Sequence, residues 1–312
     1  MCTAISITAG DNYFGRNLDY EISFGEKVIV TPRNYKLKFR NEKETDNHFA
    51  MIGMAIVKNN YPLYFDATNE NGLSVAGLRF AGNAVYNKKI DGRDNVASFE
   101  FIPYILACSK TVDDAERLLK NINITNEAFD KELKPSPLHW IISDRERSIT
   151  VEQTKDGLKV YENPLGVLTN NPPFDMQMVN LSNYMTLSAD EPGNNFTEKI
   201  DLPEYSRGMG AIGLPGDLSS MSRFVKTAFL CANSVFEGTE EEKVNQFFHI
   251  LYSVYHIRGA VRVGDKFEIT HYTSCCNTDK GIYYYTTYNS GSISKVILSD
   301  KKVDGSEIIV CS

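Results

Sequence analysis

The sequence contains only six cysteines among 312 residues, and no two of them are spaced as a C-x-x-C pair. They are scattered along the chain, unlike the cysteines of a small disulfide framework, and this is typical of reduced thiols in a cytoplasmic protein. The five histidines show none of the spacings that zinc sites use. We therefore expect a cytoplasmic protein without a structural metal and without a cofactor.

Long apolar runs and a basic leader segment are also missing. No stretch approaches the ~18 apolar residues that a membrane-spanning helix needs, and residues 1–9 contain no basic side chain. The net charge of −7 disfavours contact with nucleic-acid phosphates. We expect a protein that binds neither membranes nor nucleic acids.

What the sequence does contain is alternating secondary-structure patterns. Short runs of β-branched and aromatic residues predict antiparallel strands at 5–8, 13–19, 28–30 and 51–57. Helical spacing then appears within 98–122, where Thr111 is expected to cap the second of two helices.

The second half of the chain repeats this change of pattern. Residues 139–161 return to period two and predict a three-strand meander. Helices are expected within 219–236 and 240–255, and closing strands at 267–273, 281–288 and 292–298. Strands and helices in this order indicate the α+β class. No repeat or long linker interrupts it, so we expect one domain over 1–312.

One motif is misleading. Residues 208–213 match the G-x-G-x-x-G pattern of dinucleotide-binding turns. No predicted strand precedes them, and Pro215-Gly216 follows where a helix should run. We interpret the glycines as a sharply turning loop.

Cys2 is one peptide bond from the N-terminus, and an initiator methionine is generally removed before so small a side chain. The chain would then begin with a thiol and a free amine whose pKa is about 7.7 to 8.0 in ordinary peptides. One residue would supply nucleophile and general base. Position alone is weak evidence, because any short residue can follow Met1. The same holds for Arg16 and Asp19 on one strand, for Asn170 before Asn-Pro, and for Arg223, each of which has an ordinary structural explanation.

Their surroundings change this interpretation, because several segments in chain order resemble the choloylglycine hydrolase family, which includes bile salt hydrolases and penicillin V acylases. The segments are Met1-Cys2-Thr3-Ala4-Ile5, Phe14-Gly15-Arg16-Asn17-Leu18-Asp19, residues 61–67, residues 72–78, Leu138-His139-Trp140, Leu168-Thr169-Asn170-Asn171-Pro172, residues 213–217 and residues 281–285.

The resemblance implies an N-terminal-nucleophile hydrolase: an αββα sandwich of two antiparallel sheets between helical layers, assembled as a homotetramer. It implies cleavage of the amide that joins a bile acid to glycine or taurine, through a thioester on Cys2. The implied catalytic residues are Cys2, Arg16, Asp19, Asn170 and Arg223. We expect Asp19 to hold the amine, Arg16 and Arg223 to favour the thiolate, and Asn170 to donate to the oxyanion.

Arg79 departs from the family, which has asparagine there in most bile salt hydrolases and tyrosine in penicillin V acylases. Arginine is a permanently charged donor that could bind an oxyanion or the anionic end of the conjugate. It could equally crowd the site or disfavour protonation of the amine. An active enzyme with altered preference, a change to other amides, a weak or non-catalytic binder, and a side chain that faces solvent all stay open.

Further substrate contacts follow from position in the family. Leu18, Phe129 and Leu133 are expected to line an apolar steroid pocket, although Phe129 and Leu133 would also suit a core. Ser206 and Arg207 resemble glycine-preferring members, with Arg207 pairing with the glycine carboxylate. Alternatives to the bile acid amidase are an acylase for penicillins or acylated lactones, and an acyltransferase that passes the thioester to an amine.

Overall fold

Two antiparallel sheets stack at the centre of the computed structural model, which describes residues 1–311. The first sheet begins with the N-terminal hairpin and is completed by C-terminal strands. In spatial order it contains β12 (Val167–Leu168), β1 (Cys2–Ala9), β2 (Asp11–Tyr20), β14 (Lys266–Asn277), β15 (Ile282–Thr287) and β16 (Ser290–Ile297), with β13 (Val261–Val263) paired to β14.

The second sheet has eight strands and collects the middle of the chain together with its last strand. Its order is β11 (Gly157–Glu162), β10 (Ser148–Thr154), β9 (Leu138–Ser143), β6 (Ser74–Arg79), β5 (Tyr61–Asn69), β4 (Met51–Lys58), β3 (Lys27–Thr31) and β17 (Ile309–Cys311).

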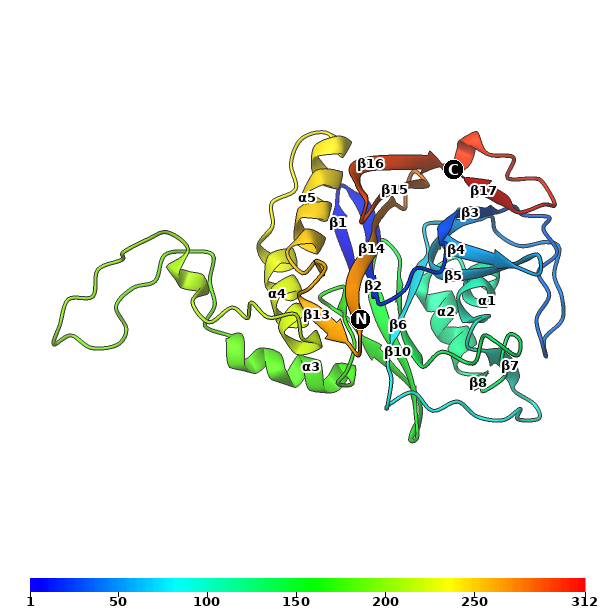
Figure 1. Cartoon of the computed structure of the whole chain (residues 1–312), viewed down its shortest axis with the longest axis horizontal. Helices are drawn as coiled ribbons and strands as arrows, with labels where there is room; N and C mark the ends of the chain where they lie inside the picture. The colour runs from blue at the N-terminus through cyan, green and yellow to red at the C-terminus, as the bar shows by residue number, and fades with distance from the viewer. Residues whose placement is uncertain (312) are drawn as a thin grey trace.

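Helices cover the outer face of each sheet, so the layers run αββα (Figure 1). On the first sheet lie α4 (Ser220–Asn233) and α5 (Glu240–Tyr252), with α3 (Phe174–Leu181) beside α4. On the second lie α1 (Phe101–Cys108) and α2 (Val112–Leu119). The expected sandwich is confirmed. Thr111 caps α2 as expected, since its side chain accepts the Asp114 N–H.

The sequence patterns located most elements, and the exceptions are short or unusual. The expected strands, the 139–161 meander and the four expected helices are all present. The helix α3 was not predicted, because two prolines and an Asn-Asn pair precede it and indicate a turn. The pair β7 (Asp94–Ala97) and β8 (Ile122–Thr125) is parallel, which the antiparallel expectation did not include.

A long segment between α3 and α4, residues 185–219, projects away from the sandwich (Figure 1). The G-x-G-x-x-G stretch lies in it as a short turn, η2 (Met209–Ala211), with Gly208 at φ +81°. Two further short turns are η1 (Ser182–Tyr184) and η3 (Leu298–Asp300). Among the described residues, no helix is long and apolar enough to cross a membrane.

Candidate active site

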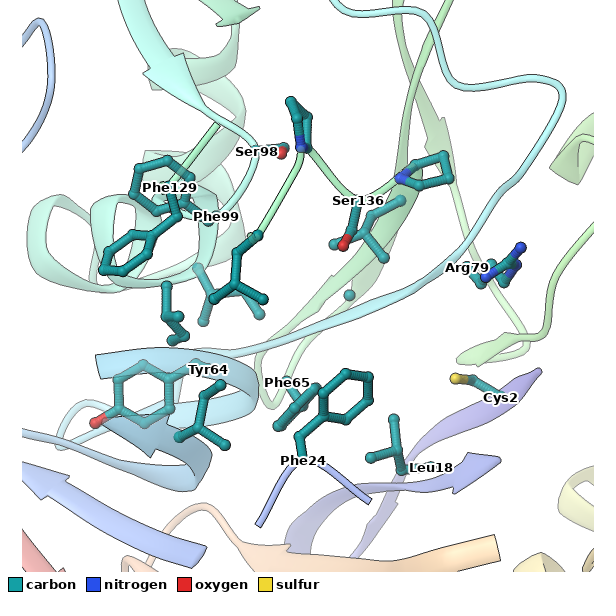
Figure 2. A pocket seen from close by; sticks show the side chains of 18 of the residues that line it. Cys2, Leu18, Phe24, Tyr64, Phe65, Arg79, Ser98, Phe99, Phe129 and Ser136 are labelled. Atoms are coloured by element: carbon teal, nitrogen blue, oxygen red, sulfur yellow. The ribbon is translucent and has the colours of Figure 1, made fainter. Parts of the chain in front are cut away.

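Cys2 begins β1 and lies opposite Leu18 of β2, in the interior between the two sheets. Its side chain is 4% exposed. Figure 2 shows the sulfur at one end of a cavity, beside Arg79. The strand pairing therefore places the thiol, and the stacked second sheet supplies the opposite wall.

The backbone nitrogen of Cys2 donates a hydrogen bond to Asn170 Oδ1 at 2.8 Å. Asn170 follows β12, the strand that pairs with β1, so sheet register brings these distant residues together. The Asn170 side-chain nitrogen donates to the carbonyl of Arg79 at 2.8 Å. Asn170 thus connects the nitrogen of Cys2 to the end of β6.

Arg223 is fully buried at the start of α4 and completes the same network. Its Nη1 donates to the carbonyl of Cys2 and to Thr3 Oγ1, each at 2.6 Å. Its Nη2 donates to Asn170 Oδ1 at 2.7 Å. Burial lowers the pKa of Arg223, which nevertheless keeps its charge at neutral pH.

Arg16 is also fully buried and lies against the strands of the second sheet. Its Nη1 donates to the carbonyls of Phe65 at 2.9 Å and Gly77 at 2.6 Å. Its Nη2 has no hydrogen-bond partner among residues 1–311, and Arg16 lines the cavity with Cys2. Burial alone would lower the pKa of Arg16, but nearby acidic groups, Cys2 first among them, raise it. Arg16 therefore brings a permanent positive charge to the cavity that Cys2 also lines.

An acidic cluster surrounds the amine of Met1. The amine lies 2.5 Å from Glu268 Oε1 and 2.5 Å from the carbonyl of Asp19. The Asp19 carboxylate accepts from Thr270 at 2.6 Å, and His256 lies between it and Glu268. Burial opposes ionisation of Glu268, but His256 and the Met1 ammonium bring its pKa below the ordinary value.

The predicted role of Asp19, which is to hold the amine of Cys2, applies to a chain without Met1 and stays a prediction. In the chain that retains Met1, the nitrogen of Cys2 bonds to Asn170, and Asp19 contributes a backbone carbonyl to Met1. Glu268 and His256 were not predicted. They lie more than 230 residues from Asp19 along the chain, and no local pattern marks either one.

The cavity beside Cys2 has a volume of about 340 Å³, and its walls are mostly apolar. This size suits a small-molecule site. The predicted residues Leu18, Phe129 and Leu133 all line it, with Arg16 and Arg79. Aromatic walls that the sequence did not indicate are Tyr20, Phe24, Tyr64, Phe65, Phe99 and Trp140.

Arg79 ends β6 and lines the cavity near the thiol (Figure 2). Its guanidinium lies 6.0 Å from the ring centroid of Tyr20, and its Nη1 donates to the Tyr20 hydroxyl at 3.3 Å. The side chain itself remains exposed. It therefore both contacts a cavity wall and keeps a charge available at the cavity.

Ser206 and Arg207 lie apart from these residues. Both are exposed on the projecting segment, and neither lines the cavity next to Cys2. Within a single chain, the structure does not bring Arg207 to the other predicted substrate contacts.

The buried carboxylate of Asp66, near Arg16, was not predicted from the sequence. Asp66 accepts from Tyr272 at 2.5 Å, from Tyr283 at 2.7 Å and from Ser274 at 3.3 Å. Burial raises the pKa of Asp66, while the charge of Arg16 opposes that effect. Asp66 stands in one of the segments that carry the family resemblance, which was the available signal.

Residues 1–311 contain no group of three or more His, Cys, Asp or Glu side chains arranged to hold a metal ion.

Comparison with known proteins agrees with this geometry. Residues 2–311 match the family "Linear amide C-N hydrolases, choloylglycine hydrolase family". The chain is 51% identical to the bile salt hydrolase/transferase of Lactiplantibacillus plantarum, over 99% of this chain and 96% of that protein. It is 38% identical to the bile salt hydrolase/transferase of Clostridium perfringens, over 99% and 95%.

Solved structures show the same fold. A mutant conjugated bile acid hydrolase from Clostridium perfringens superposes with a TM-score of 0.93 at 36% identity, covering 100% of this chain and 97% of that one. A penicillin V acylase from Agrobacterium tumefaciens gives a TM-score of 0.77 at 16% identity, covering 99% and 90%, and shares the fold.

Proposed function

The chain belongs to the choloylglycine hydrolase family of linear amide C–N hydrolases, and we propose that it hydrolyses bile acids conjugated to glycine or taurine. The observation that carries the proposal is the Cys2 thiol at one end of an apolar cavity, with its backbone nitrogen bonded to Asn170. After loss of Met1, that nitrogen becomes the α-amine of a nucleophilic cysteine.

The proposed reaction has two halves, and one amine serves both. The amine takes the thiol proton, and the sulfur attacks the amide carbonyl. As the C–N bond breaks, the proton passes to the departing amino acid and a thioester remains. Water then loses a proton to the amine and attacks the thioester. The C–S bond breaks, the bile acid leaves, and the thiol is restored.

The polar residues around Cys2 support these steps. Asn170 Oδ1 orients the amine by accepting its hydrogen bond, and Arg223 holds Asn170 in place. The unpartnered Nη2 of Arg16 is proposed to stabilise the negative charge of the attacking sulfur. Asp19 and Glu268, which contact the amine of Met1, are proposed to stabilise the ammonium form of Cys2 once Met1 is removed. The donor to the oxyanion remains a predicted role of Asn170.

The cavity supports a rigid hydrophobic acyl group as substrate. Leu18, Phe129 and Leu133 provide apolar walls, and the cavity leads to the sulfur (Figure 2). Arg79 offers a positive charge at the end where the conjugated amino acid would lie. A carboxylate or sulfonate there would pair with the guanidinium.

We also propose a preference for glycine conjugates, a homotetramer and a cytoplasmic location. Exposed apolar side chains on the projecting segment, Phe196 and Tyr205 among them, favour burial against another copy. Arg207 would reach a conjugate only if this segment folds back or a neighbouring copy presents it. Light scattering measures the assembly, and kcat/KM for glycocholate against taurocholate tests the preference. Equal or taurine-favoured values would reject it.

The decisive experiment is hydrolysis of glycocholate and taurocholate beside penicillin V and an acylated homoserine lactone. We expect release of the amino acid by the wild type, loss of turnover in Cys2→Ser, and an intact mass that lacks Met1. Retained Met1, an unreactive Cys2 or faster cleavage of penicillin V would each contradict the proposal.

A second candidate activity is acyl transfer, which is favoured by the relatives named bile salt hydrolase/transferase. Here a free amino acid attacks the thioester in place of water. Incubation with a cholic acid conjugate and a labelled amine tests it, and a labelled amide product that depends on Cys2 is expected.

A further inference from the structure

We propose that the buried pair of His139 and Glu152 positions Asn170, and through it the amine of Cys2. The inference rests on the proposed function for its kinetic consequences. His139 lies on β9 and Glu152 on the adjacent β10, and both side chains are fully buried. Neither lines the cavity, so neither contacts substrate directly.

The imidazole of His139 contacts Thr169 and Phe80, which are the chain neighbours of two hydrogen-bonded residues, Asn170 and Arg79. Its Nε2 lies 3.0 Å from the carbonyl oxygen of Thr169, the residue before Asn170. Its ring stacks on Phe80, the residue after Arg79, with centroids 4.3 Å apart and planes at 5°. Asn170 Nδ2 and the Arg79 carbonyl form the hydrogen bond between these two contacts. A shift of the imidazole would therefore move both partners.

Hydrogen bonds at both ring nitrogens fix the orientation of this ring. A carbonyl oxygen only accepts, so Nε2 carries a proton toward Thr169. Nδ1 lies 3.0 Å from Glu152 Oε1, which also accepts the backbone N–H of Phe174 at 3.1 Å. His139 is thus held at both ring nitrogens, by Glu152 on one side and by Thr169 on the other.

The pair also organises the segment that carries Asn170. Glu152 binds the first N–H of α3, and His139 binds Thr169, so the two side chains hold residues 169–174 at both ends. Asn170 itself is restrained by the bond from its backbone N–H to Ser220 Oγ at 2.8 Å. A misplacement of about 1 Å at a reacting group costs on the order of 100-fold in rate. Precise placement of Asn170 Oδ1 therefore matters for the amine.

Two substitutions of His139 test the contacts of its two ring nitrogens separately. His139→Gln retains a donor near the Nε2 position for Thr169, whereas His139→Asn retains a donor near the Nδ1 position for Glu152 only. We expect kcat for glycocholate to fall at least tenfold in His139→Asn and less than threefold in His139→Gln, with KM changed less than threefold in both. His48→Asn is the matched control, because this buried histidine also bonds two backbone carbonyls, those of Tyr35 and Phe49, away from the cavity. It should lower Tm and leave kcat unchanged.

Two readouts need no substrate and so separate this inference from the proposed function. Alkylation of Cys2 by iodoacetamide should slow at least threefold in His139→Asn, while the exposed Cys108 reacts at the wild-type rate. In the wild type, NMR should detect a slowly exchanging Nε2–H on His139, as the bond to the Thr169 carbonyl requires, and this tests the contact even if His139→Asn fails to fold. Equal kcat and alkylation rates in the two His139 variants, or an Nε2 without a proton, would overturn the proposal.

Discussion

Asn170 Oδ1 lies 2.8 Å from the backbone nitrogen of Cys2, although 168 positions separate the two residues. The same oxygen accepts from Arg223 at 2.7 Å, so one side-chain atom joins the nucleophile's nitrogen to a buried guanidinium. This contact makes Asn170 an anchor for the amine that the proposed reaction requires. Its amide nitrogen is already bonded to the carbonyl of Arg79.

Replacement of Asn170 should therefore damage catalysis by loss of an acceptor. In Asn170→Ala, kcat for glycocholate should fall on the order of 100-fold, because the amine and Arg223 both lose their partner. Asn170→Asp retains both acceptor contacts and should lose less. Steady-state kinetics with thermal unfolding checks this, and a greater loss in the aspartate variant than in the alanine variant would contradict it.

Arg79 should govern attraction of the conjugate's negative charge. In Arg79→Asn, we expect KM for glycocholate and taurocholate to rise about fivefold, which corresponds to about 1 kcal/mol for a charge pair near the surface. Arg79→Lys should be intermediate, since it keeps the charge but not the planar guanidinium. Kinetics at low and high salt is the measurement. A salt dependence identical in all three proteins would show that Arg79 contacts only Tyr20.

Phe129 should contribute to binding of the acyl group and not to the chemical step. It packs edge-on against Phe99 at 5.1 Å, and Figure 2 shows both rings far from Cys2 in that view. Removal of such a ring costs about 1.5 to 3 kcal/mol of apolar burial. Phe129→Ala should raise KM at least tenfold with kcat nearly unchanged, and Phe129→Leu should have a much smaller effect. A fall in kcat alone would argue against this assignment.

Glu100 should make the free energy of unfolding depend on pH. Burial raises its pKa from 4.5 to about 7, even though its carboxylate accepts the backbone N–H groups of Arg40 and Ala97. Between these values the folded protein binds a proton that the unfolded chain has released. The stabilising contribution is therefore complete below pH 4.5 and disappears as the pH rises through 7.

Urea unfolding at several pH values between 4.5 and 8 measures this effect. The free energy of unfolding of the wild type, relative to Glu100→Gln, should fall by about 3 kcal/mol over that range. Other titrating groups are common to both proteins and cancel in the difference. A difference that is constant, or that grows with pH, would refute the assignment.

Local patterns were enough to predict most of the secondary structure. The β-branched and aromatic runs of β1 and β2, the helical spacing of α4 and α5, and the Thr111 cap all depend on residues a few positions apart. The helix α3 was missed because Asn171-Pro172-Pro173 indicates a turn, and that signal describes only the residues before the helix. The segments shared with the family contain Cys2, Arg16, Asp19 and Asn170, and the resemblance also implied Arg223, but none of this indicated the bonds among them.

By itself, the sequence determined that a cysteine can become the N-terminal residue and that blocks of strands and helices follow in an order typical of the α+β class, while the αββα layering was implied by the family resemblance. Tertiary structure alone decided which atoms meet that cysteine. Asn170 reaches Cys2 through the pairing of β12 with β1, and Arg223 reaches it through the packing of α4 on that sheet. Secondary-structure propensity depends on residues a few positions apart. These contacts instead depend on sheet register and on the stacking of layers, which join residues more than 160 positions apart.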